Sequence, residues 1–378
     1  NVRRMTYDYY GDGDSYGLPG DLKTIVTQEW DAATQAWVGD DTNYFRYYTG
    51  ASTAHELKRV LVPNAYAAFV SAYGDPADPQ NPNGGDSQTD PISNFTCFYY
   101  EYDADHRVSD RIVFGKSNAT EYAVTLSANS RSPNTWHRKT VETRLDGSTY
   151  TVYTNYLGQA ILTDLHDPAS QTHTLTYNRF DSQGRMILAA QPSAFVLYGG
   201  KYYDESLPDL VNYAGGDSPY LSDEAGLFEI TTYYASTSPG IDEDTAGGAE
   251  GHVWQRAVAR GEDAARLTPG AQGGPILLST ITYYARTVGD ATIYPTASQT
   301  VYANEDGTGA NTTEYAYTWY SGTFQVQEET TTLPAVPAGQ NGSGASAVRK
   351  EWFDDRGNLC WSMDELGRVT SRQYNPLT

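Results

Sequence analysis

Residues 352–359 read WFDDRGNL and residues 363–370 read MDELGRVT, so one pattern occurs twice with Asp354 and Asp364 ten positions apart. Each copy places an apolar residue, Asp, two variable residues, Gly, an Arg or Asn, and another apolar residue in that order. Asp at the first position of a turn accepts hydrogen bonds from the backbone ahead of it, and Gly at the fourth position adopts conformations that other residues resist. Each copy therefore predicts a β-hairpin corner between two strands.

The same pattern recurs along the chain in less regular form. It is complete at residues 180–186 (FDSQGRM), has Asn for Asp at residues 154–160 (TNYLGQA), has His106 for Gly at residues 102–108 (YDADHRV), and is looser at residues 7–12 (YDYYGD). Short strands separated by such turns at roughly ten-residue spacing are typical of all-β proteins. We therefore predict an all-β fold, built as a long antiparallel sheet that curls or stacks.

Strand-like sequence continues between the turns. Residues 149–153, 228–234 and 277–284 alternate Thr or Ser with apolar and aromatic side chains, which is a typical strand pattern. Residues 314–320 and 323–327 flank Ser321-Gly322 and predict a compact hairpin.

Two neighbouring stretches depart from this pattern. Residues 54–73 carry apolar side chains at helical spacing, with Pro63 able to start a helix and Gly74 able to end it, so we predict one or two short helices there. Residues 74–90 are rich in Pro, Asp, Asn and Gly and predict an exposed loop. Strand-and-turn sequence resumes directly afterwards, so residues 1–378 are interpreted as a single repeat segment. Because the pattern is already under way at both ends, we expect that segment to belong to a longer chain.

The composition limits the partners of the protein. The chain has 378 residues, of which 32 are Tyr and 7 are Trp, and its formal net charge is −22. Tyr suits a half-buried pleated surface, because its ring packs while its hydroxyl reaches water. A strongly acidic surface repels nucleic acid and anionic lipid, so neither is an expected partner. No apolar run reaches membrane-spanning length, so no membrane-spanning segment is predicted.

Few residues have the spacing of a metal or redox site. Cys97 and Cys360 allow one long-range disulfide, but they form neither a disulfide scaffold nor a metal cluster. Asp12-Gly13-Asp14 resembles the start of a calcium-binding loop, but the Glu expected at the twelfth position of such a loop is missing. A simple turn is therefore favoured. Calcium is the one cofactor that the sequence suggests, and no cofactor is predicted. His166 and His173 are near neighbours and form at most a weak metal pair.

The chain resembles the RHS/YD-repeat family, which includes bacterial Rhs and WapA-type proteins, insect-toxin cage components and animal teneurins. The residues that carry the resemblance are the turns that contain Asp8, Asp103, Asp181, Asp354 and Asp364. Residues 99–103, 152–159, 177–192 and 232–237 are similar to giant RHS-repeat proteins of planctomycete-like bacteria. The resemblance implies a long sheet that spirals into a hollow shell or tube, often around a cargo. The aspartyl autoprotease segment that releases a toxin in some members is not visible in residues 363–370, so that activity is not carried over.

No catalytic, cofactor-binding or metal-binding residue is assigned, and we expect the chain not to be an enzyme. None of the common motifs for nucleophilic catalysis, metalloproteases, phosphate loops or dinucleotide binding occurs. The acidic pairs Asp354-Asp355 and Asp364-Glu365 resemble glycosidase acids, but they occupy turn positions where Asp has a structural role.

Three functional hypotheses follow. The first is a structural or encapsulating module of a large secreted or cell-surface protein, with neighbouring repeats or identical subunits as partners, and with a tube or filament as one outcome. The second is a module that binds carbohydrate or a cell surface, which predicts exposed Trp or Tyr side chains beside polar residues in a groove. The third is a shell around a toxin cargo that another part of the parent chain carries.

Overall fold

The computed structural model describes residues 2–113, 118–213, 217–263, 267 and 273–374. This described part is almost entirely β-structure, and it contains one α-helix, α1 (Pro63–Tyr73). Three short 3-10 helices are η1 (Pro91–Asn94), η2 (Pro192–Ala194) and η3 (Ala338–Gln340). The first nine strands are β1 (Arg3–Tyr9), β2 (Leu22–Asp31), β3 (Ala36–Tyr47), β4 (Leu57–Leu61), β5 (Phe98–Tyr102), β6 (Val108–Val113), β7 (Asn118–Leu126), β8 (Arg138–Thr143) and β9 (Thr149–Thr154). The later strands are β10 (Ala160–Asp167), β11 (Thr172–Phe180), β12 (Met186–Ala190), β13 (Leu227–Tyr233), β14 (Val253–Arg260), β15 (Ile276–Tyr283), β16 (Arg286–Val288), β17 (Ala291–Ile293), β18 (Thr296–Tyr302), β19 (Ala310–Trp319), β20 (Val326–Thr332), β21 (Val348–Phe353), β22 (Leu359–Met363) and β23 (Val369–Ser371).

The chain divides into two compact units. Unit 1 consists of Asn1–Ala128, His137–Thr154 and Thr163–Thr174, and unit 2 consists of Asn129–Trp136, Asn155–Leu162 and Leu175–Thr378. Unit 1 therefore holds β1 to β9, unit 2 holds β12 to β23, and β10 and β11 contribute residues to both.

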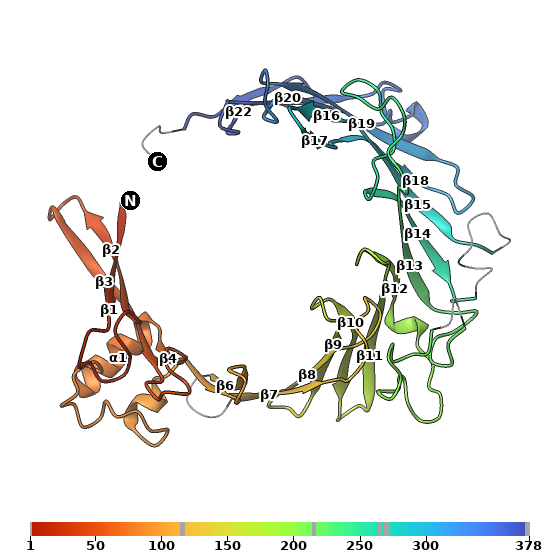
Figure 1. The fold of residues 1–378 in the computed structure, drawn as a ribbon. Helices are drawn as coiled ribbons and strands as arrows, with labels where there is room; N and C mark the ends of the chain where they lie inside the picture. Colours follow the sequence, from red (N-terminus) through yellow and green to blue (C-terminus); the bar gives the residue numbers. More distant parts are fainter. Residues whose placement is uncertain (1, 114–117, 214–216, 264–266, 268–272, 375–378) are drawn as a thin grey trace. The chain divides into compact units, whose positions relative to one another are not determined.

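Within each unit, consecutive strands pair antiparallel, as Figure 1 lets the reader trace. In unit 2 the short hairpin β16–β17 lies outside this series, so β15 pairs with β18. Twenty-one strands belong to one sheet. Among the described strands, β1 pairs only with β2 and β23 pairs only with β22. The predicted fold class, a long antiparallel all-β sheet, is confirmed.

The Asp-x-x-Gly corners adopt one shared geometry. At Asp354 the backbone N–H donates to the carbonyl of Asn358 at 2.9 Å, and the N–H of Gly357 donates to the carbonyl of Asp354 at 3.1 Å. Gly357 has φ +84°, and the two bonds place Gly357 and Asn358 opposite Asp354, which identifies a type I turn closed by a G1 bulge. The same two backbone bonds occur in the turns that begin at Asp103, Asn155, Asp181 and Asp364.

Two features of these corners differ from the sequence prediction. Asp8 lies inside β1 opposite Thr24, so the turn predicted at residues 7–12 is wrong. The alternation of polar and apolar side chains that begins at Arg4 continues through Tyr9, and pairing with β2 holds this stretch extended. Two further corners, which begin at Arg144 and Asn304, have the same pair of backbone hydrogen bonds but were not predicted.

Tyrosine hydroxyls tie alternate strands together at their ends. Tyr10 directly follows β1, and its hydroxyl donates to the carbonyl of Phe45 on β3 at 2.7 Å, so its side chain bypasses β2. Tyr234 follows β13 and donates to Ile281 on β15 at 2.9 Å. Equivalent bonds join Tyr48 to Tyr100 and Tyr320 to Phe353. An aromatic residue precedes each of these four tyrosines, so in these four places an aromatic-Tyr dipeptide spans the end of a strand.

The helix lies in unit 1 and covers part of the sheet (Figure 1). Phe69 of α1 packs with Tyr44, Leu61 and Ile92 in a fully buried cluster. The helical prediction over residues 54–73 is therefore confirmed for its second half. Residues 57–61 instead form β4, because β3 pairs with one edge of this strand and β5 pairs with the other. Pairing on both edges overrides the helical spacing of the apolar residues.

The segment 74–90 contains no helix or strand, yet part of its backbone is tied to the sheet. The guanidinium of Arg46 is fully buried, and it donates to the carbonyls of Pro76 at 2.6 Å and Gly84 at 2.9 Å. The ring of Tyr16 lies 3.6 Å from the same guanidinium. A charged side chain on β3 therefore satisfies the turn carbonyls that this Pro- and Gly-rich sequence leaves open.

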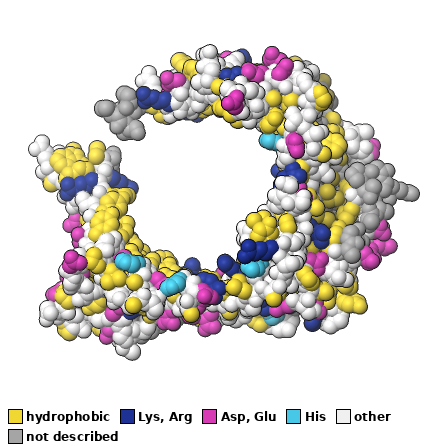
Figure 2. Space-filling model, in the orientation of Figure 1, with side chains coloured by type: hydrophobic (Ala, Val, Ile, Leu, Met, Phe, Trp, Pro, Cys, Tyr) yellow, Lys and Arg dark blue, Asp and Glu magenta, His cyan; other side chains and the backbone are white. Residues whose placement is uncertain are grey.

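Elsewhere the sheet leaves aromatic side chains on its surface. Figure 2 shows hydrophobic and basic side chains together over β1, β2 and β3. Trp30 and Trp37 face each other across β2 and β3 with ring centroids 5.4 Å apart, and Arg4 lies 4.7 Å from the Trp37 ring. Cross-strand ring and cation–π contacts thus stabilise regions where no second layer packs.

Candidate functional site

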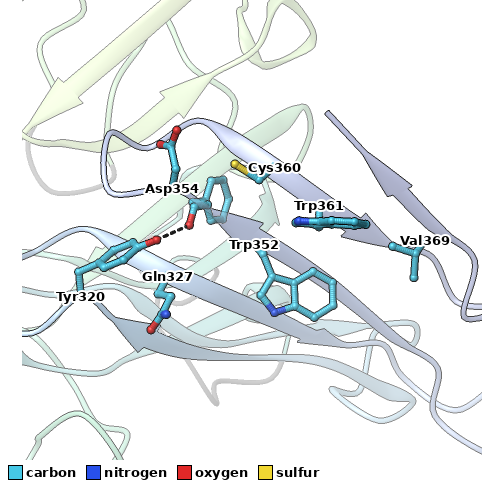
Figure 3. A pocket seen from close by; sticks show the side chains of 8 residues that line it. Tyr320, Gln327, Trp352, Asp354, Cys360, Trp361 and Val369 are labelled. Carbon is cyan, nitrogen blue, oxygen red and sulfur yellow. Dashed lines mark hydrogen bonds between the residues drawn. The ribbon is translucent and has the colours of Figure 1, made fainter. Parts of the chain in front are cut away.

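An aromatic groove on unit 2 is the feature that best fits a binding site. Strands β20 to β23 and the turns beside them form this groove, which has a volume of about 510 Å³. Figure 3 shows side chains from successive strands lining it. The lining residues are Tyr320, Gln327, Trp352, Phe353, Asp354, Cys360, Trp361 and Val369.

Strand register places the two tryptophans side by side. Trp352 on β21 lies directly opposite Trp361 on β22, so both rings project from the same face of the sheet. Trp361 is 51% exposed, and Val369 on β23 extends the same apolar surface. The sequence analysis expected exposed Trp or Tyr side chains beside polar residues for a binding module, and this groove has that arrangement.

Trp352 is held in place from the side of β20. Its indole Nε1 donates to Oε2 of Glu328 at 2.8 Å, and Lys350 donates to Oε1 of the same carboxylate at 2.6 Å. The Lys350 hydrogen bond, with those of Trp352 and Thr330, lowers the pKa of Glu328 below its usual range. Glu328 therefore stays ionised at neutral pH and fixes the orientation of the Trp352 ring.

The remaining polar groups form the rim. The hydroxyl of Tyr320 donates to the carbonyl of Phe353 at 2.8 Å, drawn as the dashed line in Figure 3. Oδ1 of Asp354 accepts the N–H groups of Arg356 and Asn358, and Oδ2 accepts the Asn358 amide at 2.9 Å. The side chain of Gln327 is exposed. The groove thus combines flat apolar surface with one open amide.

The acidic pairs noted in the sequence serve the turns. The Asn358 amide bond lowers the pKa of Asp354, and the backbone N–H of Arg368 lowers the pKa of Asp364. Glu365 pairs with Arg349. A general acid that works near neutral pH needs a raised pKa, whereas Asp354 and Asp364 have lowered ones.

The histidines do not converge on one point. His166 and His173 stack with ring centroids 4.3 Å apart, and Nδ1 of His173 lies 2.9 Å from Oδ1 of Asp164. His55 and His106 each pair with a separate carboxylate, Asp21 and Glu56 respectively. Within the described residues, no group of three or more His, Cys, Asp or Glu side chains is arranged to hold a metal ion.

The calcium-like sequence forms a hydrogen-bonded loop. Oδ2 of Asp14 accepts the N–H of Gly11 at 2.9 Å, and Nζ of Lys23 lies 3.5 Å from the same oxygen. The Gly11 bond is the main reason why the pKa of Asp14 is lowered. Cys97 is a buried free thiol in unit 1, and Cys360 is a half-buried free thiol in unit 2.

Sequence reasoning missed a buried carboxyl in unit 2. Glu262 is fully buried just after β14, and its Oε1 accepts the N–H of Ser218 at 2.5 Å. Burial, together with the nearby charges of Asp223 and Asp217, raises the pKa of Glu262 to about 7. No motif marks this residue, because its environment comes from a loop about forty positions earlier in the chain.

No helix in the described part of the chain has both the length and the apolar character needed to cross a bilayer. No protein-family model and no curated protein matches this chain.

Several solved structures are similar to this chain, with low TM-scores and low sequence identity. The crystal structure of TcdB2-TccC3 has a TM-score of 0.31 and 13% identity, and the match covers 98% of this chain and 17% of that one. A porin-like protein from Bacteroides uniformis ATCC 8492 has a TM-score of 0.24 and 13% identity, covering 67% of this chain and 88% of that one. This chain therefore spans about a sixth of the length of the TcdB2-TccC3 chain.

Proposed function

We propose that this chain is a structural repeat module of the RHS/YD type in a large secreted or cell-surface protein. The observation that carries the proposal is the long series of antiparallel neighbours in which the same turn geometry recurs at several of the corners. Such a sheet grows by adding strands, and each added strand needs only its neighbours for hydrogen bonding.

Most of the polar groups described above serve the framework. The turn carboxylates accept backbone N–H groups, and the tyrosine hydroxyls cap carbonyls two strands away. These bonds satisfy backbone groups at strand ends, where a sheet otherwise exposes them. A module of this kind contributes rigid surface and needs no reactive centre.

The two edge strands are the expected contact points with further repeats or identical subunits. On β1, the carbonyl of Val2 accepts the N–H of Trp30, so the N–H of Met5 points away from β2. On β23, the N–H of Arg372 donates to Cys360, so the N–H of Ser371 points away from β22. Both edges can pair with another strand.

Proline at these outward positions tests the proposal, because it removes a donor without breaking a bond within the sheet. Electron microscopy and light scattering of the purified protein are expected to show assemblies that the variants Met5→Pro and Ser371→Pro lose. Met5→Ala and Ser371→Ala are the matched controls and should still assemble. Assemblies of unchanged size in both proline variants, with unchanged circular dichroism, would rule out edge pairing.

The shape of the assembly separates the narrower versions of this role. Filaments or tubes favour a repeating extracellular unit, whereas closed particles with internal density favour a shell around a cargo. The second candidate function, carbohydrate binding, is favoured by the aromatic groove.

A further inference from the structure

The aromatic groove has a preorganised floor. Glu328 fixes the Trp352 ring, and the Tyr320 bond to Phe353 fixes the wall beside it. A ligand that covers these rings therefore does not have to order them, and it loses less conformational entropy on binding. Trp361 adds a half-exposed ring directly opposite Trp352.

The geometry points to the groove as a binding site for a neutral oligosaccharide whose sugars present a flat C–H face, as β-1,4-linked glucose does. Axial C–H groups of such a ring lie against an indole face, because that face carries partial negative charge. The equatorial hydroxyls then point sideways, where the Gln327 amide both donates and accepts hydrogen bonds. The groove and its rim contain both kinds of group.

Charge excludes the anionic alternatives. Asp354 lies in the lining and is held ionised, and Glu328 lies beside the Trp352 indole. The whole chain carries a net charge of −22. Sulfated or uronic glycans and nucleic acid would all meet like charge there.

The sheet itself disfavours a peptide strand in this groove. The groove lies on the face of β20 to β23, where the backbone N–H and C=O groups already pair between strands. An extended peptide binds by adding to a free edge, and Trp352 and Trp361 are not on one. Sugar rings need only the ring faces and side-chain donors that are present.

Isothermal titration calorimetry with cellohexaose tests the inference, with maltohexaose and a heparin hexasaccharide as comparators. We expect cellohexaose to bind, and Trp361→Ala to weaken it by about ten-fold or more, from the loss of one stacked ring. Trp361→Phe should keep part of the affinity. Trp254→Ala is the matched control, because Trp254 is an exposed tryptophan on β14 of the same unit, and it should bind like the wild type.

Three results would overturn the inference: no binding of cellohexaose, equal binding by Trp361→Ala, or tighter binding of the heparin fragment. Circular dichroism of each variant establishes that the fold is intact. Sugar binding is also measured on Met5→Pro, which blocks the outer edge of β1 in unit 1 and leaves the strands of the groove unchanged. A wild-type affinity there separates the binding site from assembly, so either proposal can fail without the other.

Discussion

At the scale of single residues, the first side chain accepts two backbone N–H groups of its own turn in the corners at Asp103, Asn155, Asp181, Asp354 and Asp364. Asn155 shows this where the site is buried, since it is only 2% exposed. Its Oδ1 accepts the N–H groups of Leu157 and Gln159, and its Nδ2 donates to the carbonyl of Pro133 at 2.8 Å. One side chain therefore closes its own turn and holds a second segment of unit 2.

Replacing Asn155 with Ala should lower the free energy of unfolding by roughly 2–4 kcal/mol, because it leaves three partly buried backbone groups without partners. Urea unfolding followed by circular dichroism measures the effect. Tyr156→Ala, an exposed change in the same turn, should cost much less. An equal cost for both variants would show that the turn bonds are not the source of stability.

Glu262 provides a pH prediction at the same scale. Its usual pKa of 4.5 is raised to about 7 in the folded protein. Below pH 4.5 both states are protonated and ionisation has no effect on stability. As the pH rises from 4.5 to 7, only the unfolded state loses the proton, so stability falls and then levels off above 7. The total loss is roughly 3 kcal/mol from the size of the shift.

Glu262→Gln should remove this loss, since an amide keeps the acceptor for the Ser218 N–H without acquiring charge. Urea midpoints at pH 5 and pH 8 test it: the wild type should lose more stability between the two values than the variant. Glu224→Gln, an exposed change nearby, is the control and should follow the wild type. Parallel pH profiles for all three proteins would contradict the assignment.

At the scale of elements, the tyrosine bonds between alternate strands are expected to stabilise the sheet. Tyr234→Phe keeps the ring but removes the hydroxyl that donates to Ile281, which should cost about 1 kcal/mol. Tyr198→Phe alters a tyrosine that is 58% exposed and should be nearly neutral. Thermal unfolding compares the stabilities of the two variants. If Tyr234→Phe is as stable as the wild type, these hydroxyl bonds do not contribute measurably to stability.

The sequence predicted elements well where local chemistry decides them. The corners at Asn155, Asp181, Asp354 and Asp364 were predicted, because Asp, Asn and Gly have intrinsic turn preferences. The corner at residues 304–308 also has Asn first and Gly fourth, but it was not predicted. The corner at residues 144–148 was missed because Arg144 stands first, and Asp146 accepts the Ser148 N–H instead. The elements that the sequence did not predict depend on contacts with residues distant in sequence. For example, β4 is a strand because β3 and β5 pair with it. The groove likewise depends on register, since nothing in residues 352–361 alone says that Trp352 and Trp361 will face each other.

At the scale of the whole molecule, the chain has 47 acidic and 25 basic residues. The repulsion between the surplus negative charges opposes folding. Salt screens this repulsion, with a Debye length of about 10 Å at 0.1 M. The melting temperature at pH 7 should therefore rise as sodium chloride is increased from about 10 mM to about 300 mM. Near the sequence pI of about 4.5 the charges balance, so the same series should leave the melting temperature nearly unchanged. Differential scanning calorimetry at the two pH values compares them within one protein. An equal rise in melting temperature at both pH values would mean that salt acts by strengthening hydrophobic burial. The acidic surface would then not measurably destabilise the folded protein.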